Sequence, residues 1–391
     1  MDPGFRREAG WDGVEPAMAK QDGLDPAVTS DPASRAGAVL DIDLGAIVAN
    51  WRFLAQQVAP AACAAVVKAN AYGLGAAPVA HALLAVGCRR FFVATLDEGI
   101  ALRDALGPAP EIAVFNGPLP RTAREFVAPR LIPVLNDPGQ IESWAALPAG
   151  ERPPPLIHVD TGLARLGLSA AEFADNLGRI TAVGAVGLIS HLACADTPGH
   201  KLNAMQRERF VAARRQLPGL KASLAASSGI FLGAGFHFDE VRPGAALYGV
   251  NPLPGHANPM RPVVRLTAKI IQLRKIDSGE PVGYGAAHTM AGPGMLATAS
   301  IGYADGWPRS LSHRGCGWLA GKRVPLLGRL SMDLATFDVS AVPGDALYPG
   351  NGIELIGPHY GVDDAAADAG TIGYEILTAL GARHHRVYRA P

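Results

Sequence analysis

Short apolar segments alternate with segments of helix length between residue 38 and about residue 250. Residues 38–43 alternate apolar and acidic side chains as a strand does, and Asp43 is placed to cap a helix that begins near Leu44. Apolar, partly β-branched segments then predict eight strands, at 64–67, 90–94, 112–115, 131–135, 156–159, 185–190, 223–225 and 240–242. Eight strands, each followed by a helix or loop, are typical of a TIM-like (β/α)8 barrel, whose active site lies at the carboxyl ends of the strands.

The pattern changes near Pro262. Later apolar segments are short and separated by Gly, Pro and Asp, at 263–270, 295–299, 318–319, 324–327, 334–339 and 352–356. They predict a mostly antiparallel β domain, and residues 251–259 have the composition of a linker. We therefore divide the chain into a flexible tail (1–36), a barrel (37–258) and a C-terminal β domain (259–391).

The composition excludes several classes of protein. The 391 residues include 35 Lys and Arg against 35 Asp and Glu, so no charge excess attracts nucleic acid or an anionic membrane. No apolar run reaches the roughly 18 residues of a membrane span, and the first twenty residues lack the apolar segment of a secretory signal. The four cysteines are scattered, with neither metal-ligand spacing nor a disulfide framework. We expect a cytoplasmic enzyme without a metal site.

A lysine, Lys68, stands at the end of the strand predicted at 64–67. It is either a side chain that extends from the strand end into water, or a desolvated amine with a lowered pKa that forms a Schiff base. The surrounding segment VVKANAYGLG (66–75) closely resembles the pyridoxal-phosphate lysine motif of the alanine racemase family. The resemblance implies that Lys68 carries pyridoxal 5′-phosphate and that Tyr72 helps to hold its phosphate.

Further motifs follow in the family's order. DTGLARLG (160–167) resembles the segment whose arginine, here Arg165, contacts the cofactor's phenolic oxygen and the substrate carboxylate. Some members carry a carbamylated lysine seven residues earlier, where this chain has His158, so the orientation of Arg165 needs another explanation. The resemblance places His191 beneath the cofactor ring and Ser228 at the phosphate. Taken alone, Arg165 and His191 would more often be an ordinary loop residue and a core histidine.

The segment RPGAALYG (242–249) resembles the family's RxGxxxYG motif. The resemblance implies that Gly244 and Ala245 offer backbone N–H groups to the phosphate and that Arg242 faces the pyridine nitrogen. An arginine there cannot keep that nitrogen protonated as an aspartate would, so the ring is a weaker electron sink. Racemisation is then favoured over transamination.

Racemisation needs two acid–base groups on opposite faces of the substrate carbon. Lys68 is one, and three tyrosines compete for the other. By resemblance, Tyr284 of the YG motif is the second base, Tyr303 lines the substrate entrance and Tyr374 contacts the phosphate. In GRLSMD (328–333), the backbone N–H of Met332 is implied to bind the substrate carboxylate.

In the family, Tyr284 and Met332 belong to the active site of the partner subunit, which implies a homodimer with shared sites. We therefore predict an alanine racemase that uses two-base proton transfer, for cell-wall synthesis or for alanine breakdown. Alternatives are a broad-specificity or serine racemase, a pyridoxal-dependent decarboxylase of the same fold, and a cofactor-binding protein without turnover.

Overall fold

A computed structural model describes residues 31–390, so residues 1–30 of the predicted tail lie outside the described residues. The chain divides into two units, residues 1–35 and residues 36–391. In the first unit the structure describes one short helix, α1 (Pro32–Arg35). All further description concerns the second unit.

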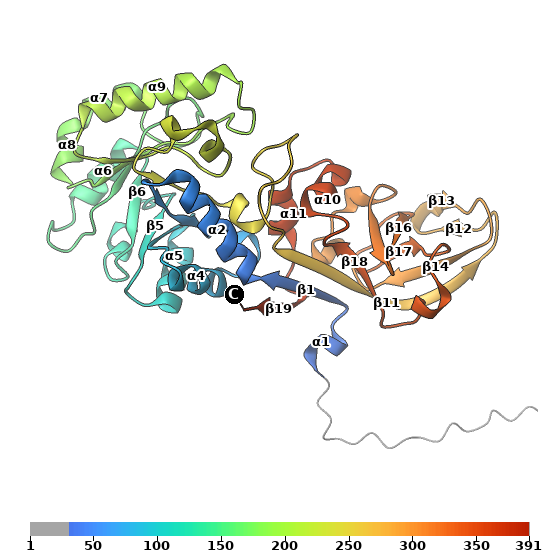
Figure 1. Ribbon diagram of the computed structural model, residues 1–391. Helices are drawn as coiled ribbons and strands as arrows, with labels where there is room; N and C mark the ends of the chain where they lie inside the picture. Colours follow the sequence, from blue (N-terminus) through green and yellow to red (C-terminus); the bar gives the residue numbers. More distant parts are fainter. Residues whose placement is uncertain (1–30, 391) are drawn as a thin grey trace, which may run out of the picture. The chain divides into compact units, whose positions relative to one another are not determined.

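The first domain of this unit is built on a curled parallel sheet (Figure 1). Seven strands follow one another in chain order: β3 (Ala65–Val66), β4 (Arg90–Val93), β5 (Glu111–Val114), β6 (Ile132–Leu135), β7 (Leu156–His158), β8 (Gly187–Ile189) and β9 (Lys221–Ser223). An eighth strand, β10 (Glu240–Val241), pairs with β2 (Ala62–Cys63). Hydrogen bonds from Arg242 N to the Ala225 carbonyl and from Val66 N to the Pro243 carbonyl, both 2.9 Å, connect this strand to both ends of the sheet. The predicted barrel class is confirmed.

Helices cover the outside of the sheet, which explains why its strands are almost continuously apolar. They are α2 (Leu44–Val58), α4 (Ala76–Ala85), α5 (Leu96–Leu106), α6 (Pro138–Ala145), α7 (Ala170–Asp175), α8 (Leu177–Ala182) and α9 (Lys201–Gln216). The predicted cap at the start of α2 is present, because Asp43 Oδ1 accepts from Ala46 N at 2.8 Å. Helix α5 begins with a capping box, in which Thr95 and Glu98 bond each other's backbone N–H groups.

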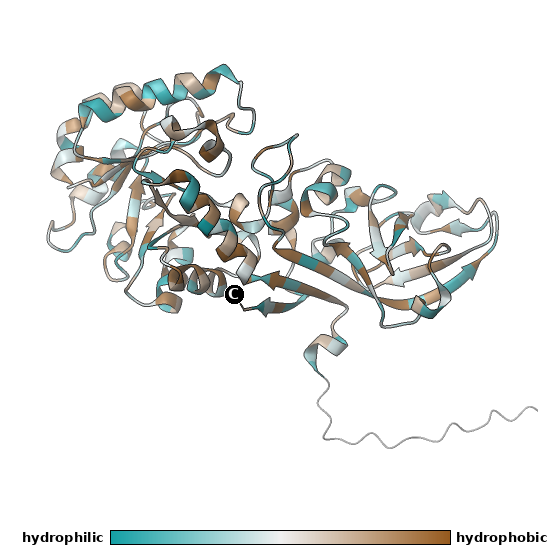
Figure 2. Ribbon diagram, in the orientation of Figure 1, coloured by the Kyte–Doolittle hydropathy of each residue, from teal (hydrophilic) through white to brown (hydrophobic). Residues whose placement is uncertain are grey.

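The second domain is a closed antiparallel sheet. Its strands are β11 (Val264–Ile276), β14 (Gly294–Ala299), β15 (Cys316–Leu319), β16 (Lys322–Leu327), β17 (Ala335–Asp338) and β18 (Gly352–Ile356), with the small hairpin β12 (Pro281–Val282) and β13 (His288–Thr289). The sheet closes because β14 pairs with both β17 and β11. Along the first half of β11 every second residue is buried, and Figure 2 shows the resulting alternation of hydrophobic and hydrophilic residues.

Two strands from the ends of the chain complete this second sheet. Strand β1 (Ala38–Asp43) pairs antiparallel with β11, Leu40 opposite Leu266, and parallel with the last strand, β19 (His385–Arg389). Residues 38–43 are therefore bonded to the β domain although they precede the barrel in the chain. Two helices that the pattern did not predict, α10 (Val362–Ala369) and α11 (Gly373–Ala379), lie between the β domain and the barrel (Figure 1). Across residues 31–390, none of the helices has the length and apolar character to cross a membrane.

Candidate active site

A cavity of about 940 Å³ opens at the carboxyl ends of the barrel strands, and residues of α10 and α11 form its other wall. Nine of the predicted site residues line it: Lys68, Tyr72, Arg165, His191, Ser228, Arg242, Gly244, Ala245 and Tyr374. Three others, Tyr284, Tyr303 and Met332, are not among its lining residues. The fold thus brings together residues from six separate segments of the sequence.

Lys68 begins a strained turn at the end of β3. The element α3 (Lys68–Tyr72) is left-handed, since residues 69–72 have φ values between +52° and +54°. Such a conformation costs roughly 1–2 kcal/mol for each residue with a side chain, so other contacts must hold it. Glu98 Oε1 accepts from Ala69 N at 2.6 Å, and Asn70 Oδ1 accepts from Ala76 N at 2.8 Å. These bonds fix the backbone that carries Lys68.

The Lys68 amine lies in the cavity, with Nζ 5.9 Å from the centre of the Phe115 ring. Burial lowers its pKa, and the positive charge of Arg165 lowers it further, while the Glu98 carboxylate acts in the opposite direction. A lowered pKa increases the share of free amine near neutral pH. The group is therefore suited to act as a nucleophile or as a base.

A narrow cradle lies at Gly244. The Tyr72 hydroxyl occupies the space that a Cβ at Gly244 would need, so only glycine allows the backbone and the phenol to meet. The N–H groups of Gly244 and Ala246 both donate to Ser227 Oγ, at 3.1 Å. The short helix η4 (Ala245–Tyr248) follows directly. Hydroxyl and backbone N–H groups gathered at one point fit a phosphate.

Arg242 is fully buried at the bottom of the cavity. Its guanidinium donates to Ser223 Oγ and to the Ser190 carbonyl. Burial lowers its pKa to about 10, and the Glu240 carboxylate opposes that shift. Arg242 therefore stays charged at neutral pH.

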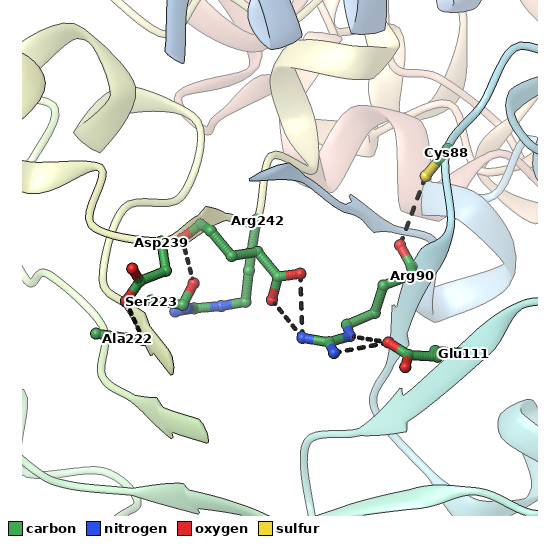
Figure 3. A network of polar contacts seen from close by, with 8 residues as sticks. Cys88, Arg90, Glu111, Ala222, Ser223, Asp239 and Arg242 are labelled. Carbon is green, nitrogen blue, oxygen red and sulfur yellow. Dashed lines mark hydrogen bonds and ion pairs between the residues drawn. The ribbon is translucent and has the colours of Figure 1, made fainter. Parts of the chain in front are cut away.

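A network of charged groups lies beneath Arg242 (Figure 3). Arg90 pairs with Glu240 at 3.0 Å and with Glu111 at 2.6 Å. Ser223, which accepts from Arg242, donates its own proton to the Glu240 carbonyl at 2.6 Å. The network holds Ser223 in place and puts a carboxylate near the buried guanidinium.

Two histidines near Arg242 are neutral. Burial, reinforced by the positive charge of Arg242, lowers the pKa of His158 to about 4 and that of His191 to about 3. His158 Nδ1 lies 2.8 Å from Asn136 Oδ1. Because Asn136 Nδ2 donates to the Phe115 and Val134 carbonyls, its Oδ1 must accept, and the proton of His158 is on Nδ1.

The loop that carries Arg165 is held by Asp160. Its carboxylate accepts from the N–H groups of three successive residues, Gly162, Leu163 and Ala164, at 2.8–3.0 Å. The last of these three has a positive φ of 55°. Gly167 closes the loop against His158, because a Cβ there would lie 3.0 Å from the imidazole Cδ2. Asp160 thus gives the loop that carries Arg165 three backbone anchors.

The three predicted residues outside the cavity are on the surface of the β domain. The exposed fractions are 71% for Tyr284, 42% for Tyr303 and 54% for Met332. Tyr284 begins the short helix η5 (Tyr284–Ala286), and Tyr303 begins η6 (Tyr303–Asp305). Within one chain, these residues do not share a cavity with Lys68.

Three residues that organise the site were not predicted from the sequence: Glu98, Asn136 and Ser227. The spacing Thr95-x-x-Glu98 is a capping-box signal that points to the first. The contact of Asn136 with His158 had no local signal, because 22 residues separate the two.

Comparison with known proteins agrees with this geometry. The family model for the N-terminal domain of alanine racemase matches residues 42–252, and that for the C-terminal domain matches residues 263–388. An alanine racemase of Rhodospirillum rubrum is 52% identical over 360 residues, which cover 90% of this chain and 96% of that protein. A catabolic alanine racemase of Mesorhizobium japonicum is 50% identical, over 96% of this chain and 99% of that protein. The crystal structure of alanine racemase from Bartonella henselae with covalently bound pyridoxal phosphate superimposes with a TM-score of 0.87 at 43% identity, covering 90% of this chain and all of that one.

Proposed function

This chain belongs to the alanine racemase family, and from that premise we propose that it interconverts L-alanine and D-alanine with pyridoxal 5′-phosphate as its cofactor. The observation that carries the proposal is the Lys68 amine, which shares one cavity with the cradle at Gly244 and with the charged Arg242. The relative from Bartonella henselae, which holds pyridoxal phosphate covalently, supports the choice of cofactor.

The residues of the cavity fit this cofactor by their chemistry. The Lys68 amine would bind its aldehyde, and Tyr72, Ser228, Gly244, Ala245 and Tyr374 would hold its phosphate. Pyridoxal phosphate, when bound, withdraws electrons from the substrate and so acidifies the hydrogen on Cα. Arg242 would face the ring nitrogen. Because it remains charged, it would not hold a proton on that nitrogen, which favours racemisation over transamination.

Proton transfer on the two faces of Cα is assigned to Lys68 and Tyr284. Burial lowers the pKa of Lys68, which increases the share of free amine that can act as a base. The guanidinium of Arg165 would bind the substrate carboxylate, together with the backbone N–H of Met332. His191, half-buried and kept neutral by its lowered pKa, would support the ring without moving protons.

The exposure of Tyr284 and Met332 supports a homodimer in which each chain completes the site of the other. Mixing two inactive variants tests this sharing. In a heterodimer of Lys68→Ala and Tyr284→Phe chains, both substitutions fall in one site and the other site is intact.

Random exchange makes half of the dimers hybrid, so activity should recover to about a quarter of the unaltered value. Each variant taken through the same exchange alone is the control. Absence of recovery in dimers shown to have exchanged chains would contradict shared sites.

Alanine is the preferred substrate because both curated relatives compared above are named for it. No feature of the cavity favours the alternative of a serine or broad-specificity racemase. The catabolic relative leaves two biological roles, alanine breakdown and supply of D-alanine for the cell wall. A cytoplasmic location stays a prediction.

The proposed function is tested with the purified protein. We expect a visible absorbance band that borohydride bleaches while it fixes the cofactor to Lys68, and D-alanine should form from L-alanine. A panel of amino acids should show alanine as the fastest substrate. A protein that binds pyridoxal phosphate but exchanges no Cα hydrogen of alanine with D2O would refute racemisation, and release of CO2 would indicate a decarboxylase.

A further inference from the structure

One arginine near the C-terminus joins two loops of the β domain. Arg383 Nε lies 3.2 Å from Asp305 Oδ1, and its NH1 donates to Asp333 Oδ1 at 2.7 Å. Asp305 ends η6, which begins with Tyr303, and Asp333 directly follows Met332. Arg383 itself lies in the turn between α11 and β19. It therefore touches two of the three loops that carry exposed, predicted site residues.

The η6 loop packs closely against the loop that carries Met332 on one side and against the end of α11 on the other. A Cβ at Gly302 would collide with the Met332 carbonyl, and one at Gly306 would collide with the Ala379 carbonyl at the end of α11. The Ala304 N–H donates to the Met332 carbonyl at 2.9 Å. On the other side, Gly381 N and His384 Nε2 bond the Asp305 carbonyl at 2.9 and 2.8 Å.

The loop of residues 329–334, called here the Met332 loop, makes fewer contacts with the turn after α11 than η6 does. It contacts η6 on one side, while the side chains of Met332 and Asp333 are about half exposed. Its link to the turn after α11 is the pair between Asp333 and Arg383. Helix α11 in turn lines the cavity of its own chain through Tyr374 and Thr378. Arg383 thus connects the wall of one cavity with a loop proposed to serve the partner's cavity.

The energetics of this pair point to a role other than stability. Both partners are more than half exposed, and ion pairs of that kind contribute little to the free energy of unfolding. Arg383 can nevertheless orient a loop, because its planar guanidinium bonds two carboxylates in one fixed geometry.

We propose that Arg383 is a positioning residue that holds the Met332 loop in register with α11, so that the Met332 N–H meets the substrate carboxylate in the partner's site. The proposal rests on the proposed function and on the shared site. Without Arg383, the loop keeps its bonds to η6 but loses its attachment to the turn after α11. Substrate binding then weakens, while the chemistry at Lys68 is preserved.

The test compares Arg383→Met with Arg389→Met. Arg389 forms a similar exposed pair, with Asp41 at 2.9 Å, but joins β19 to β1 far from both loops. Arg383→Met should raise KM for alanine about tenfold or more while kcat stays within about twofold, since misplacing a binding group acts mainly on binding. Arg389→Met should leave both unchanged. Equal KM values in the two variants would overturn the proposal.

Two further variants test whether the change in KM comes from the ion pair between Asp333 and Arg383. Asp333→Asn should also raise KM, and the double variant should be no worse than Arg383→Met alone, because Arg383→Met already removes the ion pair with Asp333. Arg383→Lys should recover only part of the KM, since an ammonium does not reproduce the two-carboxylate geometry. Additive effects in the double variant would contradict the proposal.

Amide hydrogen exchange separates this proposal from the proposed function. Residues 329–334 should exchange faster in Arg383→Met than in Arg389→Met, whether or not the protein is active. If the unaltered protein fails to racemise alanine, the proposed function falls, and the exchange result alone decides whether Arg383 holds the loop. Unchanged exchange in an active enzyme overturns the positioning role.

Discussion

The barrel end of the site and the β-domain loops differ in how completely one chain supports them. At the barrel end Arg242 is 3% exposed and bonds Ser223 and the Ser190 carbonyl, and burial shifts the pKa values of its neighbours. On the β domain, Tyr284 is 71% exposed and lies outside the cavity. The cofactor half of the site is therefore formed within one chain, while the other half lies on an open surface.

This difference has a physical consequence for how substitutions act. Groups at the barrel end are desolvated, so removing one of them leaves buried partners unpaired and affects folding as well as chemistry. The exposed loops contribute little to folding, so substitutions there should affect the reaction alone. Four predictions test this contrast.

Lys68→Ala should have the largest effect, a loss of racemisation of at least about 10³-fold, because the same amine binds the cofactor and moves a proton. The visible absorbance band should disappear with it. Lys221→Ala is the matched control, since Lys221 begins β9 at the opposite end of the barrel. A Lys68→Ala protein that keeps its band would refute the assignment.

Tyr284→Phe should reduce racemisation on the order of 10²-fold or more, because it removes one of two acid–base groups. Its melting temperature should stay close to that of the unaltered protein, since the side chain is exposed. Tyr348→Phe, an equally conservative change at another exposed tyrosine of the β domain, should change neither quantity. An unchanged rate for Tyr284→Phe would move the role to another residue.

Ser223→Ala should destabilise the protein by about 1–3 kcal/mol, because the Arg242 guanidinium and the Glu240 carbonyl both lose a buried partner. Urea unfolding measures this change. Ser278→Ala removes an exposed hydroxyl that bonds the Ala291 carbonyl and should change stability by less than about 0.5 kcal/mol. Similar losses in the two variants would contradict the contrast between the regions.

The last prediction concerns the stability of the protein at acidic pH, since at neutral pH no effect of His158 protonation is expected. His158 has a pKa of about 4 in the folded protein, below its ordinary value, so the unfolded chain binds its proton more readily. Its contribution to stability is therefore complete above about pH 6.5 and falls as the pH drops towards 4, by at most about 1.4 kcal/mol per pH unit. His158→Gln should show a shallower loss of unfolding free energy over that range. Parallel curves for the two proteins would contradict a neutral His158.

Much of the barrel was predictable because its signals are local. Each of the eight predicted strands overlaps an observed strand, and the Asp43 cap is present. Helices α10 and α11 were missed because they follow a run of strands and have the small, mixed residues of loops. Eight of the nine predicted residues that line the cavity follow strands of the barrel, and the carboxyl ends of parallel strands meet at one edge. The ninth, Tyr374, lies on α11.

The order of strands, the lysine at a strand end and the motifs around Arg165, Arg242 and Tyr284 were determined by the sequence alone, because each depends on residues that are neighbours in the chain. The pairing of β1 with β19, the bond between His158 and Asn136 and the link from Arg383 to Asp333 were decided only by the tertiary structure. These contacts join residues far apart in the chain, and the burial that shifts the pKa values of Lys68 and His191 exists only once the barrel and α11 have closed around them.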